Sequence, residues 1–176
     1  RDRLRSRGLG DVYKRQESGN VGILDLVAGL KWVHNNIAQF GGDPSNVTIM
    51  GQSGGGAKVC TLVAMAETKG LLHKAVALSG NITGAIDNNY STELGKYILK
   101  EAGLPPSQIN KLQEIPWLDY IVLANRAAAK YDKQLGGNGM MRGSFGPVGD
   151  GFHIPMDTFY TDPEAVSYTH LTLPTK

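Results

Sequence analysis

The sequence predicts an α/β fold in which a parallel β-sheet is flanked by helices, with a helical insertion after the second strand. Two short runs of apolar or β-branched residues, Val47–Met50 and Ala75–Ser79, are typical of buried strands. A helical pattern precedes the first run, and another separates it from the second. Because this alternation is typical of right-handed parallel crossovers, we expect both strands in one parallel sheet, the first covered on both faces.

The first helix is predicted from Asn20, a plausible N-cap residue, to about Phe40. The run Gly41-Gly42-Asp43-Pro44 would end it, since glycine favours a C-terminal cap and proline cannot continue a helix. Its apolar residues recur at helical spacing and form one continuous stripe: Leu26, Leu30, Val33, Ile37 and Phe40.

The stretch between the first strand and the next helix reads Gly51-Gln52-Ser53-Gly54-Gly55. This Gly-x-Ser-x-Gly pattern is typical of a nucleophile elbow, in which a tight strand-to-helix turn presents a serine hydroxyl outward. Gly51 and Gly55 are expected to be structural, because positions two before and two after the serine must nearly lack side chains. Ser53 is therefore the candidate nucleophile, and the backbone N–H of Gly54 is the candidate oxyanion donor.

Two alternatives fit parts of this stretch. In a chain with 23 glycines it could be a flexible loop, which the flanking strand and helix argue against. A phosphate-binding loop would need Gly-Lys-Ser/Thr, whereas this chain has Gly56-Ala57-Lys58-Val59. A nucleotide-binding domain is therefore the less favoured reading, since no hydroxyl follows the lysine to hold magnesium.

The helix after the elbow carries an inward stripe of small and apolar residues: Gly56, Val59, Cys60, Val63 and Ala64. Cys60 is the only cysteine, so an internal disulfide is impossible and a core position is expected. Beyond the second strand, Ser91 is placed to cap a helix that ends near Gly103, and Trp117–Lys130 predicts another. The segment Gly136–Gly151 holds seven glycines and predicts a loop.

Composition and charge restrict the possible partners. The chain is 41% apolar and 19% charged, and it has no apolar run long enough to span a membrane. Residues 1–16 and 166–176 resemble translated adapter sequence and are interpreted as non-native tails, which leaves residues 17–165 as the domain. The whole chain has a net charge of +2, and the two tails together contribute +5. Residues 17–165 therefore have a net charge of −3, so a nucleic-acid partner is not expected.

From about Glu17 to Ala165 the sequence resembles carboxylesterases of the cholinesterase-like α/β-hydrolase family, most strongly as far as Gly80. The elbow and the residues after it, Gly-Gln-Ser-Gly-Gly-Gly-Ala-Lys, are most similar to the bacterial para-nitrobenzyl-esterase branch. The other shared motifs, in chain order, are Gly19-Asn20-Val21-Gly22, Trp32-Val33 with Asn36-Ile37, Phe40-Gly41-Gly42-Asp43-Pro44, Asn46-Val47-Thr48, Gly70-Leu71, Leu78-Ser79-Gly80 and Phe145-Gly146-Pro147-Val148-Gly149-Asp150-Gly151 with Ile154-Pro155.

The resemblance implies a partial α/β-hydrolase fold and a serine hydrolase that cleaves small-molecule carboxylic esters with water, through an acyl-enzyme and without a metal or organic cofactor. It places the catalytic acid and histidine downstream of Ala165 and further oxyanion donors upstream of Glu17. The chain is thus expected to be a central fragment, inactive alone. Gln52 stands where cholinesterases have glutamate, which argues against a cationic choline substrate, and Gly54 stands where alanine is common.

The main alternative function is a non-catalytic relative of this family that is used for protein–protein contact.

Four histidines are candidates for the general base. His34 precedes the elbow, His73 follows it too closely, and His170 lies in the C-terminal tail. Only His153 fits the chain order Ser, Asp/Glu, His, with Asp132 or Asp150 as its possible carboxylate. Order by itself does not establish triad geometry.

Overall fold

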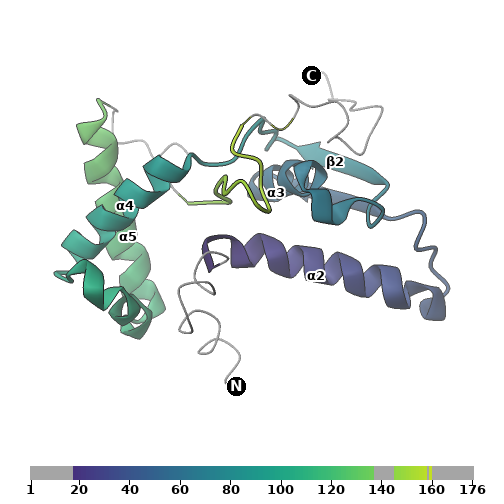
Figure 1. The fold of residues 1–176 in the computed structure, drawn as a ribbon, viewed down its shortest axis with the longest axis horizontal. Helices are drawn as coiled ribbons and strands as arrows, with labels where there is room; N and C mark the ends of the chain where they lie inside the picture. The colour runs from purple at the N-terminus through teal and green to yellow at the C-terminus, as the bar shows by residue number, and fades with distance from the viewer. Residues whose placement is uncertain (1–17, 137–144, 158, 160–176) are drawn as a thin grey trace. The chain divides into compact units, whose positions relative to one another are not determined.

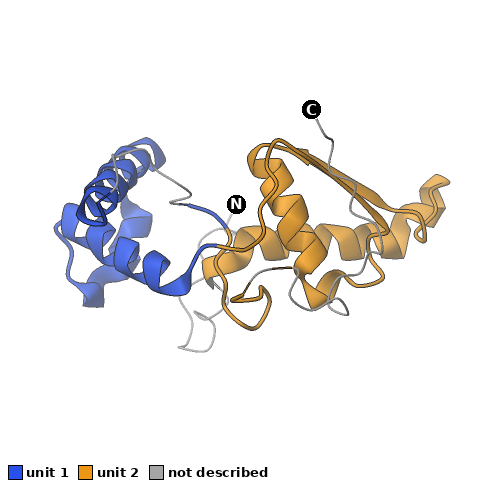
Figure 2. Ribbon diagram, turned by 90° about the horizontal axis from the view of Figure 1, so that it is seen from above, with its two compact units in different colours: residues 1–10, 86–146 blue, residues 11–85, 147–176 orange. Residues whose placement is uncertain are grey.

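The computed structural model describes residues 18–136, 145–157 and 159, and the chain divides into two compact units (Figures 1 and 2). The sheet unit comprises the described residues up to 85 and from 147 onward, and the helical unit comprises those within 86–146. Each unit has its own cluster of buried apolar residues. The proposed tails lie outside the described residues.

The sheet unit begins with a long helix. A short 3-10 turn, η1 (Ser18–Asn20), leads into helix α2 (Val21–Asn36), which a second 3-10 turn, η2 (Ile37–Phe40), extends. Gly41 follows with φ of 81°, in the left-handed region that favours glycine. The predicted end of this helix is confirmed.

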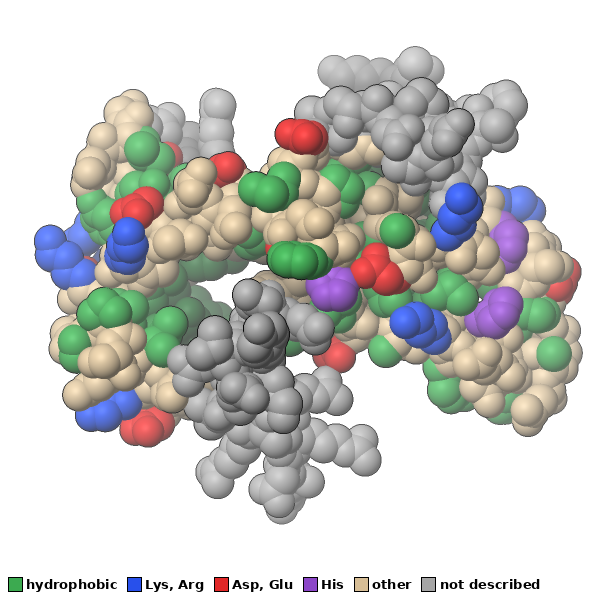
Figure 3. Space-filling view, in the orientation of Figure 1, with side chains coloured by type: hydrophobic (Ala, Val, Ile, Leu, Met, Phe, Trp, Pro, Cys, Tyr) green, Lys and Arg blue, Asp and Glu red, His purple; other side chains and the backbone are tan. Residues whose placement is uncertain are grey.

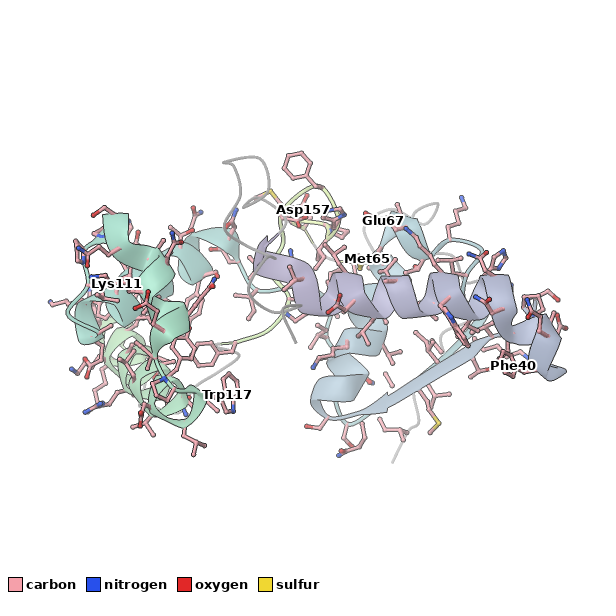
Figure 4. The ribbon with its side chains drawn as sticks, turned by 90° about the horizontal axis from the view of Figure 1, so that it is seen from below. Phe40, Met65, Glu67, Lys111, Trp117 and Asp157 are labelled. Carbon is pink, nitrogen blue, oxygen red and sulfur yellow. The ribbon has the colours of Figure 1, made fainter. Side chains whose placement is uncertain are left out.

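Two details of this helix differ from prediction. The buried residues of α2 are Ile23, Val27 and Leu30, whereas Leu26 is exposed and Phe40 is 72% exposed (Figure 4). Phe40 leaves the helical phase because the chain switches from α to 3-10 geometry after Asn36. Asn20 precedes α2, but its side chain makes no capping hydrogen bond and instead contacts residues 148–150.

The two predicted strands pair in parallel, with bounds shifted by one or two residues. Strands β1 (Thr48–Gln52) and β2 (Lys74–Leu78) are in register along their full length. Helix α3 (Gly54–Ala64) and the 3-10 turn η3 (Ala66–Thr68) form the crossover between them. Helix α3 lies between α2 and the sheet (Figure 1), and its predicted inward stripe is buried, Cys60 included.

One face of this sheet is covered and the other is open in the described part of the chain. Ile49, Ala75 and Ala77 pack against the core to which α2 and α3 contribute. On the other face Met50 is 71% exposed and Val76 is also exposed. Hydrophobic side chains also reach the surface elsewhere, on the face of the molecule that Figure 3 shows. The expectation of a first strand covered on both faces is wrong for the described residues, since both helices pack on one side.

The helical unit contains α4 (Asn88–Glu101), the 3-10 segment η4 (Pro106–Glu114) and α5 (Trp117–Gln134). Its buried cluster joins α4 and α5 through six residues: Leu94, Ile98, Ala124, Ala127, Ala128 and Tyr131. The helix predicted from Trp117 is confirmed, and that residue is exposed (Figure 4).

The predicted cap of α4 is wrong. The carboxylate of Asp87, and not the hydroxyl of Ser91, accepts the capping hydrogen bond, from the N–H of Tyr90 at 2.8 Å. Of the predicted loop, residues 137–144 lie outside the described residues, and 145–151 contain no helix. Among the helices described, none combines the length and apolar character that a membrane span requires.

Candidate active site

Ser53 occupies a one-residue turn between β1 and α3. The strand ends at Gln52, the helix begins at Gly54, and Ser53 between them has φ of 54° and ψ of −121°. A positive φ is uncommon for a residue with a side chain and persists only where the surrounding structure imposes it. Ser53 is also exposed, so it is not packed in the core.

Backbone hydrogen bonds on both sides impose this conformation. The N–H of Ser53 donates to the carbonyl oxygen of Leu78, the last residue of β2, at 2.8 Å. The carbonyl oxygen of Ser53 accepts from the N–H of Ala57 in α3 at 3.1 Å. The serine is therefore fixed to the sheet and to the helix at once.

Gly51 and Gly80 make room for the turn. A Cβ added at Gly51 would lie 2.3 Å from the carbonyl oxygen of Gly55, closer than real Cβ contacts come. A Cβ added at Gly55 would meet no described atom within 4 Å, so the steric requirement falls on Gly51 and not on Gly55. The tightest site is Gly80, where a Cβ would lie 1.8 Å from the carbonyl oxygen of Ser53.

Gly80 is the structural residue that pattern reasoning missed. It follows β2, and the carboxyl ends of parallel strands lie at the same edge of a sheet. A glycine directly after the second strand, at that edge, was the available signal. The neighbouring Ser79 also has a positive φ, of 50°, so each strand is followed directly by a serine with a positive φ.

Gly54, the candidate oxyanion donor, lies at the N-terminus of α3. As the first residue of α3, its N–H has no acceptor within the helix and lies at the positive end of the helix dipole. The ammonium group of Lys58 donates to the carbonyl oxygen of Gly54 at 3.3 Å and brings a further positive charge. The electrostatics of the turn thus favour an oxyanion over a cation.

Comparison with known proteins assigns this arrangement to a family. Residues 3–168 match the model of the Carboxylesterase family. The chain belongs to the carboxylesterase family. Its sequence is 38% identical over 114 residues to para-nitrobenzyl esterase of Bacillus subtilis (strain 168), which covers 65% of this chain and 23% of that protein. It is 44% identical over 95 residues to liver carboxylesterase 1 of Oryctolagus cuniculus, covering 53% of this chain and 16% of the relative.

Solved carboxylesterase structures agree with this assignment. A thermophilic para-nitrobenzyl esterase superposes with a TM-score of 0.65 at 32% identity, over 78% of this chain and 27% of that one. The chain therefore has part of an α/β-hydrolase fold, as the sequence predicted, and it spans about a quarter or less of the length of these relatives.

Two histidines of this carboxylesterase segment have no place in the candidate site. His73 accepts a hydrogen bond through Nδ1 from the N–H of Val47 at 3.2 Å, a structural role at the start of the sheet. His34 is exposed on α2. His170 lies outside the described residues.

His153 is paired with a carboxylate that sequence reasoning did not consider. Its Nδ1 lies 2.5 Å from Oε1 of Glu67, while the backbone N–H of His153 donates to Oδ1 of Asp150. Ser53 lies directly before α3, and Glu67 lies after its end. Because α3 has 11 residues, its two ends are about 16 Å apart at 1.5 Å per residue. The interpretation of His153 as the base for Ser53 is therefore wrong, because Glu67 holds it at the opposite end of α3. Asp132 belongs to α5 of the helical unit.

Within 18–136, 145–157 and 159, no group of three or more His, Cys, Asp or Glu side chains is arranged to hold a metal ion.

Proposed function

We propose that this segment supplies the nucleophile, Ser53, and one oxyanion donor, Gly54, of a carboxylic-ester hydrolase. The observation that supports the proposal is the strained and exposed conformation of Ser53 between β1 and α3, in a chain of the carboxylesterase family. Ser79 is also exposed and has a positive φ, but Ser53 in addition stands in the Gly-x-Ser-x-Gly turn at the N-terminus of α3. A non-catalytic interaction module is disfavoured for the same reason.

The reaction would proceed through an acyl-enzyme. The hydroxyl of Ser53 attacks the ester carbonyl carbon while its proton passes to a histidine contributed by another part of the enzyme. The N–H of Gly54 donates to the oxyanion of the tetrahedral intermediate, an interaction worth about 3 kcal/mol in the transition state. The alcohol then leaves with a proton, and water cleaves the acyl-enzyme to release the carboxylic acid.

The charge around the serine favours neutral esters over cationic ones. Gln52, directly before Ser53, is exposed and neutral, and the ammonium group of Lys58 lies by Gly54. A quaternary ammonium group would find no negative charge among these residues and would be repelled by Lys58. We expect small, uncharged carboxylic esters as substrates.

A chimeric enzyme tests the proposal. Residues 18–157 would replace the matching segment of the Bacillus subtilis para-nitrobenzyl esterase, and hydrolysis of p-nitrophenyl butyrate would be measured. We expect turnover in the chimera and a loss of about 10⁴-fold or more in kcat on Ser53→Ala. Ser45→Ala, at an exposed serine in the turn before β1, serves as the matched control and should retain activity.

Two results would contradict the proposal: a folded chimera with no turnover, or a Ser53→Ala chimera that remains as active as its parent. The 176-residue chain by itself is expected to be inactive on the same ester. It is also expected to be poorly soluble, because the two-stranded sheet of the described residues leaves strand edges unpaired.

A further inference from the structure

The chain leaves the sheet unit at Ala85 and returns to it at Pro147. We call residues 148–156 the return segment. It contains no helix, yet Ile154 within it is fully buried in the core of the sheet unit. The burial of Ile154, backbone hydrogen bonds from the N–H groups of Asp150 and Gly151 to the carbonyl oxygen of Ile154, and several side-chain hydrogen bonds hold it in place.

Asn20 and Asp150 fix the first half of the return segment. The buried side chain of Asn20 accepts from the N–H of Val148 at 2.9 Å and donates to the carbonyl oxygen of Val148 at 2.9 Å. It also donates to Oδ2 of Asp150 at 2.8 Å. Oδ1 of Asp150 accepts the N–H groups of Phe152, His153 and Ile154, so the backbone that carries His153 is fixed.

Glu67 is fixed equally well on the other side. It lies in η3 between Met65 and Thr68, both of which are fully buried (Met65 and Glu67 are labelled in Figure 4). The hydroxyl of Thr68 donates to the carbonyl oxygens of Leu62 and Met65. The turn therefore presents the carboxylate of Glu67 from a rigid backbone.

The two side chains meet in a partly buried contact. Nδ1 of His153 lies 2.5 Å from Oε1 of Glu67, and the side chains are 24% and 29% exposed. The second oxygen, Oε2 of Glu67, is buried and has no hydrogen-bond partner among the described residues. Compensation of the carboxylate charge thus depends on His153, and separating the pair would leave a buried charge without a partner.

We propose that Glu67 and His153 form a pH-sensitive clasp that fastens the return segment to the end of helix α3. Imidazole changes its charge between about pH 5 and 8, and a hydrogen bond between two charged groups is roughly twice as strong as one between neutral groups. The clasp is strongest where imidazolium faces carboxylate, and it weakens as rising pH removes the imidazolium proton. It does not depend on the proposed function, because it lies at the far end of α3 from Ser53.

Other charged groups occur on the elements packed around the clasp, and the experiment must separate their effects. Within the described residues these are Asp25, Lys31 and His34 of α2, Lys69 after η3, and Asp150 and Asp157 near His153. Of these only His34 is an imidazole, so it is the one whose charge changes over the same pH range. A His34→Gln variant is therefore the matched control for His153→Gln.

Amide hydrogen exchange of the full 176-residue chain, read by mass spectrometry on peptides covering 148–157, tests the clasp. After correction for intrinsic exchange rates, we expect protection of this peptide to be about fivefold greater at pH 6 than at pH 8.5, the effect of one charge-assisted contact. His153→Gln and Glu67→Gln should each remove this difference, and the double variant should lose no more than either single one. His34→Gln should retain it, and peptides from α4 should not change.

An unchanged pH dependence in His153→Gln would overturn the clasp, as would additive losses in the double variant. If His153→Gln fails to fold, Glu67→Gln decides, because it keeps the shape of the side chain and removes only its charge. Neither outcome bears on turnover by Ser53, so the two proposals fail separately.

Discussion

Different kinds of contact hold the elbow and the return segment. The elbow depends on glycine and backbone: Gly51 against Gly55, and Ser53 bonded to Leu78 and crowded by Gly80. The return segment depends on polar side chains that join residues 86 and 130 positions apart. The first is a steric device and should be insensitive to pH, whereas the second is electrostatic and should respond to it.

The largest expected effect tests the steric side of this comparison. Gly80→Ala would place a Cβ 1.8 Å from the carbonyl oxygen of Ser53. The backbone of Ser53 cannot move away, because its hydrogen bonds to Leu78 and Ala57 fix it. We expect a loss of about 4 kcal/mol or more in the free energy of unfolding, or failure to fold. Urea denaturation would measure it.

Gly55→Ala is the control for this substitution, because its Cβ would meet no described atom within 4 Å and alanine favours a helix. It should leave stability unchanged or raise it by up to about 1 kcal/mol. If both variants behaved alike, the close approach of Gly80 to Ser53 would not govern the elbow.

The next effect tests the electrostatic side. Burial acts to raise the pKa of Asp150, but hydrogen bonds from Ile154, Phe152, Asn20 and His153 together hold it below its ordinary value. The carboxylate therefore stabilises the fold at pH above the ordinary value of about 4, and this contribution is lost as pH falls through the lowered pKa. Asp150→Asn would also set a new amide donor against the amide of Asn20.

We expect Asp150→Asn to cost about 1–2 kcal/mol at pH 7 and the difference from the parent chain to shrink as pH falls below about 4. Thermal unfolding followed from pH 7 to pH 2 would measure both. A difference that stays constant over this range would show that the carboxylate charge has no part in holding the return segment.

The same contrast explains what the sequence could predict. The elbow was predictable because its glycines and serine lie within five residues of one another. The parallel sheet was predictable because helix and strand patterns alternate along one continuous stretch of the chain. The partnership of Glu67 with His153 was not, since nothing in either neighbourhood specifies a contact 86 residues away. Phe40 was misplaced because a single helical period was assumed through a segment that becomes 3-10.

A smaller effect separates strain from function at the elbow. Ser53→Gly removes the penalty of a positive φ on a residue with a Cβ, so we expect the chain to gain about 1 kcal/mol in stability. Ser79→Gly is the matched variant, since its φ of 50° is also positive and it leaves the candidate nucleophile in place. In the chimera Ser53→Gly should abolish turnover and Ser79→Gly should not. A loss of stability in Ser53→Gly would show that the serine side chain, and not the neighbouring backbone, holds the turn.

The smallest effect gives the baseline against which the clasp is judged. Lys96 and Glu93 form an ion pair one helical turn apart in α4, with side chains 62% and 46% exposed. Solvent screens such a pair, so Lys96→Gln should cost only about 0.3 kcal/mol and the cost should vanish in 1 M salt. Thermal unfolding at low and high salt would measure it beside Glu67→Gln. Because Glu67 has a buried oxygen that depends on His153 for charge compensation, its loss should be larger and should persist in salt. Equal costs for the two variants would mean that the fixed backbones around the clasp give it no advantage over a surface ion pair.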